Sequence, residues 1–304
     1  MQLSRARTFN LGARLACLAL AAGLLAAGCV TGGSQSTGSP SAVPTDSAGP
    51  SGSAGPSDSV SPSGFYLRMW QTQAVAPVAA FGQLPQVTIS DGMFIDGRVA
   101  IPMIYPGPLW IGPSVRTITA AGIASIVAEA RTAGLLGTVR DFADGSVAGT
   151  VTGHIEMTVE GTTYDLTGPV SMPDGGAPTP GTAAAFETFW QKLGDASSWV
   201  ASALGSTTTY EPTRLAVLAT APAAVSVGVT AADTAWPLTT PFASFGSAFG
   251  GTADRCAVVS GADLASLISV VKQSNQLTRF VDAQGAKDSL VVRVLVPGEP
   301  SPCV

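Results

Sequence analysis

The chain contains few side chains that could move a proton near neutral pH. His154 is the one histidine, and it lies close in sequence to Glu156 and Asp165. A histidine paired with a carboxylate can act as a general base, because its ordinary pKa is about 6.5. A lone histidine at the head of a strand is more often a solvated surface residue. We therefore expect His154 to have no catalytic role.

A serine and a lysine form a second candidate site. Ser269-Val-Val-Lys272 matches the Ser-x-x-Lys motif of penicillin-recognising enzymes, in which the serine opens a helix at the active site. Here the serine falls in the middle of a predicted helix, and the sequence has neither Ser-Asp-Asn nor Lys-Thr-Gly. A nucleophile elbow, a phosphate-binding loop and a dinucleotide-binding motif are also missing from the sequence. The sequence thus predicts no catalytic residue and no cofactor site.

Metal ligands are also sparse. With one histidine and no cysteine cluster, the sequence argues against a zinc site. The run Asp141-Phe-Ala-Asp144-Gly145 comes nearest to a calcium-binding loop, but it lacks most of the ligand positions and so predicts a turn. Asp91 and Asp96 are a carboxylate pair that an envelope hydrolase could use as acid and base, and this alternative stays open.

Cys29 is the strongest candidate for a chemical modification. Three arginines precede an apolar run at 15–27, which closes on Ala26-Ala27-Gly28-Cys29. This run is too short for a spanning helix, which needs roughly 20 residues. The arrangement is typical of a lipoprotein signal peptide at 1–28, after which the Cys29 thiol receives a diacylglycerol. An ordinary signal peptide is the alternative, because leucine is commoner than alanine three residues before the lipidated cysteine.

The anchor implies a location and an organisation for the rest of the chain. Residues 30–63 are almost entirely Ser, Gly, Pro, Ala and Thr, a composition that buries too little apolar surface to fold. We expect 29–63 to be the lipidated cysteine and a disordered tether, and 64–304 to be a globular domain, with a split near 178 as an alternative. The domain would sit on the extracytoplasmic face of the cell membrane, which the lipid anchor contacts.

The charge of the chain excludes some partners. Once the three arginines of the signal peptide are removed, 12 basic residues stand against 20 acidic ones, a net charge of −8. An acidic surface argues against nucleic acid and against direct binding to anionic lipid headgroups. An envelope protein or a cell-wall component of unknown identity is the remaining class of partner.

Cys256 and Cys303 are the two cysteines that follow the predicted anchor. Two such thiols in an oxidising compartment are expected to form a disulfide. A reactive or metal-binding pair is disfavoured, because no histidine or third cysteine is placed to join them. The bridge would tie the residues around 303 to an internal strand.

Three amphipathic helices and a series of strands must position these side chains. Thr119, Thr182 and Ser260 are predicted N-caps, each followed by apolar residues at helical spacing. Strands are predicted from alternating or apolar runs that end at turn dipeptides such as Asp91-Gly92. The predicted strands cover 65–73, 86–90, 93–95, 155–160, 163–166, 215–219, 225–229, 256–259 and 290–296. Helices spaced among hairpin-type strands predict an α+β fold with a mostly antiparallel sheet.

One internal similarity suggests two related halves. Thr119-Ala-Ala-Gly-Ile-Ala-Ser-Ile-Val aligns with Ser260-Gly-Ala-Asp-Leu-Ala-Ser-Leu-Ile, and each segment is followed, after a polar gap, by a strand. A duplication with halves near 64–178 and 179–304 would explain the match. The alternative is that any two amphipathic helices match along their apolar faces.

Several short motifs resemble a known group of proteins. They are Leu67-Arg68, Leu84-Pro85, Asp91-Gly92, Cys256-Ala-Val-Val-Ser-Gly261, Arg293-Val-Leu-Val-Pro-Gly-Glu299 and Cys303. Together they resemble the motifs of uncharacterised lipoproteins of actinobacteria. That group has no assigned activity, so the resemblance implies a membrane-anchored location and the disulfide, and no reaction.

The sequence therefore predicts a cell-surface lipoprotein whose domain is a non-catalytic binding or assembly module. An envelope hydrolase with a carboxylate pair is the alternative. A cleft with two acids roughly 5–9 Å apart would favour the hydrolase, and an exposed apolar patch would favour binding.

Overall fold

A computed structural model of the chain describes residues 64–73, 76–99, 104–143, 151–170, 179–222 and 230–303. These residues belong to one compact unit, which spans 54–304. They form two sheets with helices packed against them, and every strand pair in the described part is antiparallel except one. This is the α+β fold with mostly antiparallel sheet that the sequence predicts.

The first sheet has the strand order β6-β5-β1-β2-β3-β4-β7, so the first described strand lies near its middle. Its strands are β1 (Tyr66–Thr72), β2 (Val87–Ser90), β3 (Met93–Asp96), β4 (Ser114–Thr117), β5 (Thr152–Val159), β6 (Thr162–Pro169) and β7 (Thr208–Thr209). Leu67 and Met69 of β1 are fully buried on one face, because side chains alternate along a strand. Arg68 and Trp70 belong to the opposite face.

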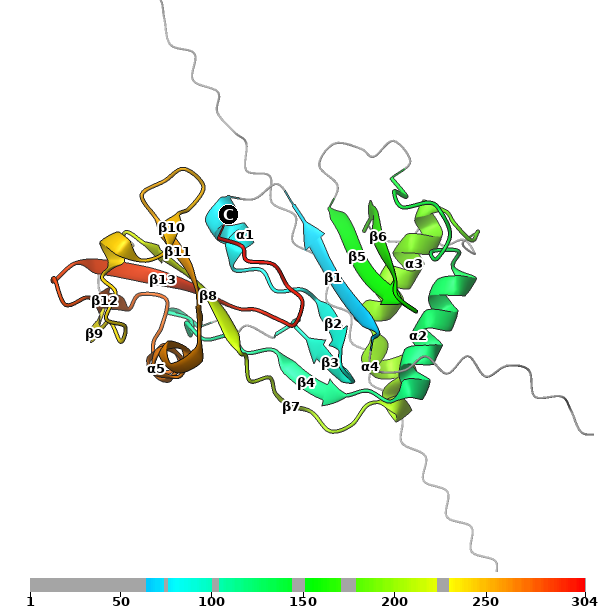
Figure 1. The fold of residues 1–304 in the computed structure, drawn as a ribbon, viewed down its shortest axis with the longest axis horizontal. Helices are drawn as coiled ribbons and strands as arrows, with labels where there is room; N and C mark the ends of the chain where they lie inside the picture. Colours follow the sequence, from blue (N-terminus) through cyan, green and yellow to red (C-terminus); the bar gives the residue numbers. More distant parts are fainter. Residues whose placement is uncertain are drawn as a thin grey trace, which may run out of the picture. The chain divides into compact units, whose positions relative to one another are not determined.

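Three helices cover the buried face of this sheet. They are α2 (Ala120–Thr132), α3 (Ala183–Gly194) and α4 (Ala196–Trp199), and Figure 1 shows α2 and α3 beside β5 and β6. Their apolar stripes join the strands in one hydrophobic core. The aromatic residues Phe186 and Trp190 of α3 lie directly over β6 and β5, where Gly168 and Gly153 are cross-strand neighbours. A Cβ at either glycine would collide with these rings, so the two glycines allow α3 to approach the sheet closely.

The second sheet has the order β10-β11-β8-β13-β12-β9, and its one parallel pair is β12 with β9. Its strands are β8 (Arg214–Thr220), β9 (Asp233–Ala235), β10 (Ser247–Ala248), β11 (Arg255–Ser260), β12 (Arg279–Val281) and β13 (Lys287–Val294). Helix α5 (Gly261–Val271) packs on the face that carries Leu215 and Val217 of β8. The short helix α1 (Pro77–Phe81) packs on the other face, where its Phe81 meets Leu218 and Leu295. This sheet is therefore covered on both sides.

Most of the caps and turns predicted from a few adjacent residues are confirmed. The hydroxyls of Thr119 and Thr182 accept hydrogen bonds from backbone N–H groups in the first turns of α2 and α3. Ser260 precedes α5 as predicted, but its side chain makes no capping hydrogen bond. Asp91 and Gly92 both have positive φ and form the tight turn between β2 and β3. The predicted turn at 161–162 lies one residue earlier, at Glu160-Gly161.

The structure also has elements that the sequence analysis did not identify. Strands β4, β7, β9, β10 and β12 and helices α1 and α4 are all short, so they carry little periodic signal. The predicted strand at 225–229 lies outside the described residues. The strands that follow helices α2 and α5 pair differently. Strand β5, after α2, pairs antiparallel with β1 and β6, whereas β12, after α5, pairs antiparallel with β13 and parallel with β9.

The predicted disulfide between Cys256 and Cys303 is confirmed, with a Cα–Cα distance of 5.3 Å. It holds the segment 295–303, which leaves β13, passes β1 and returns toward α1 (Figure 1). In the described part of the chain, no helix has the length and hydrophobicity that crossing a bilayer requires.

Candidate functional site

A groove lies where the two sheets meet, and it consists of three adjoining cavities. The first, of about 340 Å³, shares Gln83, Leu84 and Arg293 with the second, of about 320 Å³. It shares Gly82 and Val292 with the third, of about 350 Å³. Because the cavities share walls, we treat them as one groove. Each is within the range of about 300–1,000 Å³ that is usual for ligand sites.

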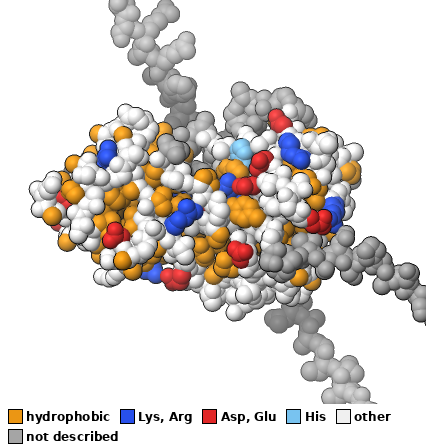
Figure 2. All heavy atoms as spheres, viewed as in Figure 1, with side chains coloured by type: hydrophobic (Ala, Val, Ile, Leu, Met, Phe, Trp, Pro, Cys, Tyr) orange, Lys and Arg blue, Asp and Glu red, His pale blue; other side chains and the backbone are white. Residues whose placement is uncertain are grey.

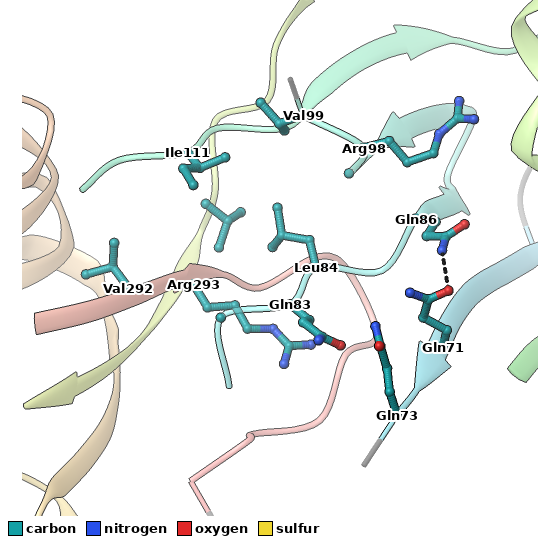
Figure 3. Close-up of a pocket in the computed structure, with 13 residues that line it drawn as sticks. Gln71, Gln73, Gln83, Leu84, Gln86, Arg98, Val99, Ile111, Val292 and Arg293 are labelled. Atoms are coloured by element: carbon teal, nitrogen blue, oxygen red, sulfur yellow. Dashed lines mark hydrogen bonds between the residues drawn. The ribbon is translucent and has the colours of Figure 1, made fainter. Parts of the chain in front are cut away.

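Segments far apart in the chain supply the walls of this groove. Figure 3 shows the first cavity, with the end of β1 and the loop that leads into β2 on one side and strand β13 on another. Arg98 and Val99, which follow β3, and Ile111 complete its rim. The groove therefore exists only in the folded chain.

Four glutamines of the first cavity give this part of the groove its hydrogen-bonding character. Gln86 donates from Nε2 to Oε1 of Gln71 at 3.1 Å, as the dashed line in Figure 3 marks. The amides of Gln73 and Gln83 make no hydrogen bond to any described residue. Each free amide offers two N–H donors and one carbonyl acceptor. The groove can thus bind the donors and acceptors of a polar ligand.

A buried ion pair stands behind the second cavity. Arg293 of β13 pairs with Glu299, whose side chain is only 3% exposed. The other carboxylate oxygen of Glu299 accepts the N–H of Val296 at 3.1 Å, and its backbone carbonyl accepts from Arg214 at 2.6 Å. Burial, with a contribution from the positive charge of Arg68, lowers the pKa of Arg293 to about 10. The guanidinium stays charged at neutral pH, so Glu299 is its counter-ion.

A row of charged and aromatic side chains continues from the groove across the open face of the first sheet. Arg68 pairs with Glu156 at 2.8 Å, and its guanidinium lies 4.3 Å from the centre of the Trp70 ring. Trp70 stacks on His154 with ring centres 5.1 Å apart and planes within 10°. Figure 2 shows the histidine in pale blue beside acidic and basic side chains. Cation–π and stacking contacts of this kind fix the Trp70 ring as a flat wall.

Buried side-chain atoms without a hydrogen-bond partner gather near this row. They include the hydroxyls of Tyr66 and Thr88 and the Nε atoms of Arg68 and Arg293. Burial raises the pKa of Tyr66 to about 12, with Arg68 lowering it and Glu156 raising it to smaller extents. Each unpaired buried group costs about 1–3 kcal/mol, so such groups are rare in folded proteins. Their concentration here favours this face and the groove beside it as the functional region.

Among the residues that the structure describes, His154 has no carboxylate partner. Its Nε2 lies 2.9 Å from the hydroxyl of Thr72, while Glu156 is engaged by Arg68. Burial lowers the pKa of the imidazole. The ring is therefore neutral near pH 7 and serves as the stacking partner of Trp70.

The other sequence candidates are not brought together. Asp91 lies in the turn of the β2–β3 hairpin and accepts from the hydroxyl of Ser90, whereas Asp96 ends β3 and pairs with Arg98 at 2.8 Å. The two carboxylates thus occupy opposite ends of the hairpin. Asp141 accepts the N–H of Ala143 in a local turn.

Ser269 and Lys272 also form no site. Ser269 is exposed on α5, and Lys272, just beyond that helix, lies over the ring of Trp110 and 3.9 Å from Glu211. Among the described residues, no group of three or more His, Cys, Asp and Glu side chains is placed to hold a metal ion. Asp144 of the calcium-like run lies outside those residues.

Sequence reasoning missed the glutamines and the Arg293–Glu299 pair. Glutamines form no recognisable sequence motif. The Arg293–Glu299 pair depends on a turn after β13 that brings Glu299 back to Arg293, and the apolar pattern of the predicted strand at 290–296 does not reveal that turn. The signal that was present is the alternation of β1, which predicts that Arg68 and Trp70 share one face.

Comparison with protein-family models, with curated proteins and with solved structures finds no match for the chain. The functional argument therefore rests on the fold and the groove. The resemblance to lipoproteins of actinobacteria stays a prediction. Cys29 and the tether lie outside the described residues, so the lipid anchor stays a prediction as well.

The buried ion pair predicts a strong asymmetry between single and double substitutions. Glu299→Ala should lower the free energy of unfolding by about 3–5 kcal/mol, because it leaves the buried Arg293 guanidinium without a counter-ion. Combining it with Arg293→Met should recover part of that loss. Urea denaturation measures both values. As a control, Glu211→Ala removes an exposed partner and should cost less than about 1 kcal/mol. Equal losses for Glu299→Ala and Glu211→Ala would contradict the assignment.

His154 predicts a pH dependence of stability. Its folded-state pKa is lowered from the ordinary value, so the unfolded chain binds the proton more readily. The free energy of unfolding should therefore fall as the pH drops from 7 through about 6.5 toward 5. His154→Gln removes this contribution while keeping a polar side chain. The measurement is the difference between wild type and His154→Gln at each pH, and a constant difference from pH 8 to 5 would refute the prediction.

Proposed function

We propose that the protein is a non-catalytic binding module of the cell envelope and that the groove is its binding site. The observation that carries this proposal is a continuous groove with unpaired amides on Gln73 and Gln83 and with no free acid among its described lining residues. Such a lining can hold a polar ligand by hydrogen bonds without altering it.

The state of the carboxylates favours binding over hydrolysis. Glycoside-type hydrolysis needs one carboxyl group that gives up a proton and a second that stays ionised. Near the groove, Glu299 and Glu156 are each paired with an arginine. Neither is a free carboxyl group that could act on a ligand there. Asp91 and Asp96, the pair proposed from the sequence, occupy opposite ends of a hairpin.

The aromatic and charged row beside the groove supports the same function. Trp70 contributes to the second cavity together with Arg68 and Pro300. Contacts with the Arg68 guanidinium and the His154 ring hold the Trp70 ring in place, so it loses little freedom when a ligand contacts it. Tryptophan and arginine are also the residues that most often dominate binding energy at interfaces.

The location completes the proposal. A diacylglycerol on Cys29 would hold the protein in the membrane, and a flexible tether at 30–63 would carry the domain about 30–35 Å from the bilayer. A binding site at that distance can reach envelope proteins or cell-wall components. The domain itself would need no contact with lipid.

Groove substitutions test the binding function. The double variant Gln73→Ala/Gln83→Ala should lose at least tenfold in binding to envelope components, because it removes the two free amides, and it should keep its melting temperature. The full-length chain in detergent is the bait, and capture from solubilised envelope is quantified. Gln273→Ala/Gln284→Ala is the matched control, since both glutamines are exposed and lie outside the groove. Equal capture by the two double variants would contradict the proposal.

Cys29→Ser tests the anchor. The variant should leave the membrane fraction or accumulate as an uncleaved precursor, because a serine hydroxyl cannot take the thioether-linked lipid. Fractionation with immunoblotting and intact mass measure the outcome. Normal processing with unchanged membrane retention would refute lipidation at this cysteine, without bearing on the groove.

A further inference from the structure

One wall of the groove is a strand edge that has no partner strand among the described residues. Strand β13 pairs with β8 from Ser289 to Val294. On its other side it pairs with β12, but only at Lys287 and Asp288. Past Asp288, this second edge of β13 faces the groove.

The direction of the free backbone groups follows from the flanking hydrogen bonds. The N–H of Leu295 donates to the carbonyl of Arg214, at the start of β8. Backbone groups of successive strand residues point to opposite sides. Those of Leu290, Val292 and Val294 therefore point away from β8, and no described backbone group pairs with them. Leu290 and Val292 line the third cavity, and Val292 and Val294 line the first.

The next position in this series shows what the free edge can bind. The N–H of Val296 points to the same side and donates to the carboxylate of Glu299 at 3.1 Å. Asp288, at the other end of the series, is paired with Phe280 of β12. The three unpaired positions thus lie between two satisfied ones. At 3.3 Å per residue they span roughly 13 Å, room for a strand of about five residues in line with β12.

The opposite walls suit the side chains of such a strand. Pro108 and Leu109 make the wall of the third cavity largely apolar at its β12 end, where Gln276 is the polar residue. Gln71 and Gln83 make the other end polar, and Figure 3 shows these glutamines across the cavity from Val292. A bound strand could place apolar side chains at one end and polar ones at the other.

We propose that the groove binds an extended polypeptide segment of a partner protein, added as a strand to the free edge of β13. This inference rests on the proposed function, since it names the ligand class of the same groove. Main-chain N–H and C=O groups at strand spacing match the alternating groups of Leu290, Val292 and Val294, which is how strand addition gives affinity. A glycan has no such repeat of donors and acceptors.

Two other occupants fit the groove less well. The chain's own residues 30–63 are rich in Pro, Gly and Ser, which form strands poorly. A second copy that paired β13 with β13 would have to bring together two edges that each lie recessed between groove walls. A segment of a different protein meets neither obstacle.

The experiment selects peptides on the full-length chain in detergent. A displayed library of random nine-residue peptides is the probe, and chitotetraose is the non-peptide probe. We expect a selected peptide to bind wild type and to lose at least tenfold on Gln73→Ala/Gln83→Ala. N-methylation of its alternate amides should abolish binding in one register and leave it within twofold in the other, because only one set of amides faces β13.

Hydrogen exchange gives a readout that needs no variant of the protein. The bound peptide should protect the amides of Leu290, Val292 and Val294. The amides of Val291 and Arg293, which face β8, should not change. Protection confined to residues outside β13 would overturn the inference.

The remaining outcomes separate this inference from the proposed function. If chitotetraose binds in a glutamine-dependent way and no peptide does, the groove is a binding site and the peptide inference is wrong. Peptide binding that tolerates methylation in both registers also refutes strand addition. If neither probe binds and groove substitutions leave capture from envelope unchanged, the proposed function and the inference fall together.

Discussion

The buried pair of Glu299 and Arg293 is the interaction on which the rest of the site depends. One carboxylate joins strand β13, through Arg293, to the turn that follows it, through the N–H of Val296. The carbonyl of the same residue holds Arg214 of β8. A charge in this position costs free energy unless every oxygen is satisfied, so the turn has one favourable geometry. That geometry sends the chain across the first sheet, where it becomes a wall of the groove.

A close approach follows from this turn. Gly298 has a φ of +73°, and a Cβ there would collide with the ring of Tyr66 on β1. The segment therefore lies against the first strand of the described fold, and the disulfide at Cys303 holds its far end. The Tyr66 hydroxyl is buried without a partner as a consequence. This buried hydroxyl lowers the stability of the fold, because the segment that packs on Tyr66 supplies no hydrogen-bond partner for it.

Much of the fold follows from local sequence signals, and the candidate site does not. The threonine caps of α2 and α3, the turn at Asp91-Gly92 and the buried alternation of β1 each depend on a few adjacent residues. The disulfide follows from counting cysteines. The groove depends on contacts such as the one from Arg293 to the carbonyl of Phe81, 212 residues away. No spacing in the sequence encodes that meeting, and among the described strands the second edge of β13 is paired only at Lys287 and Asp288, because β12 is short.

The position of β13 also sets the order in which this molecule can be built. Strands β1 to β6 pair among themselves, so all strands of the first sheet except β7 can assemble from contacts within residues 66–169. The second sheet cannot, because its inner strand β8 pairs with β13, which comes much later in the chain. The groove also requires the turn at Glu299. We therefore expect a stage during synthesis in which the first sheet lacks only β7 and the segment around Gly298 does not yet lie against Tyr66. Long-range contacts of this kind slow folding, so we expect the groove to form after most of the first sheet.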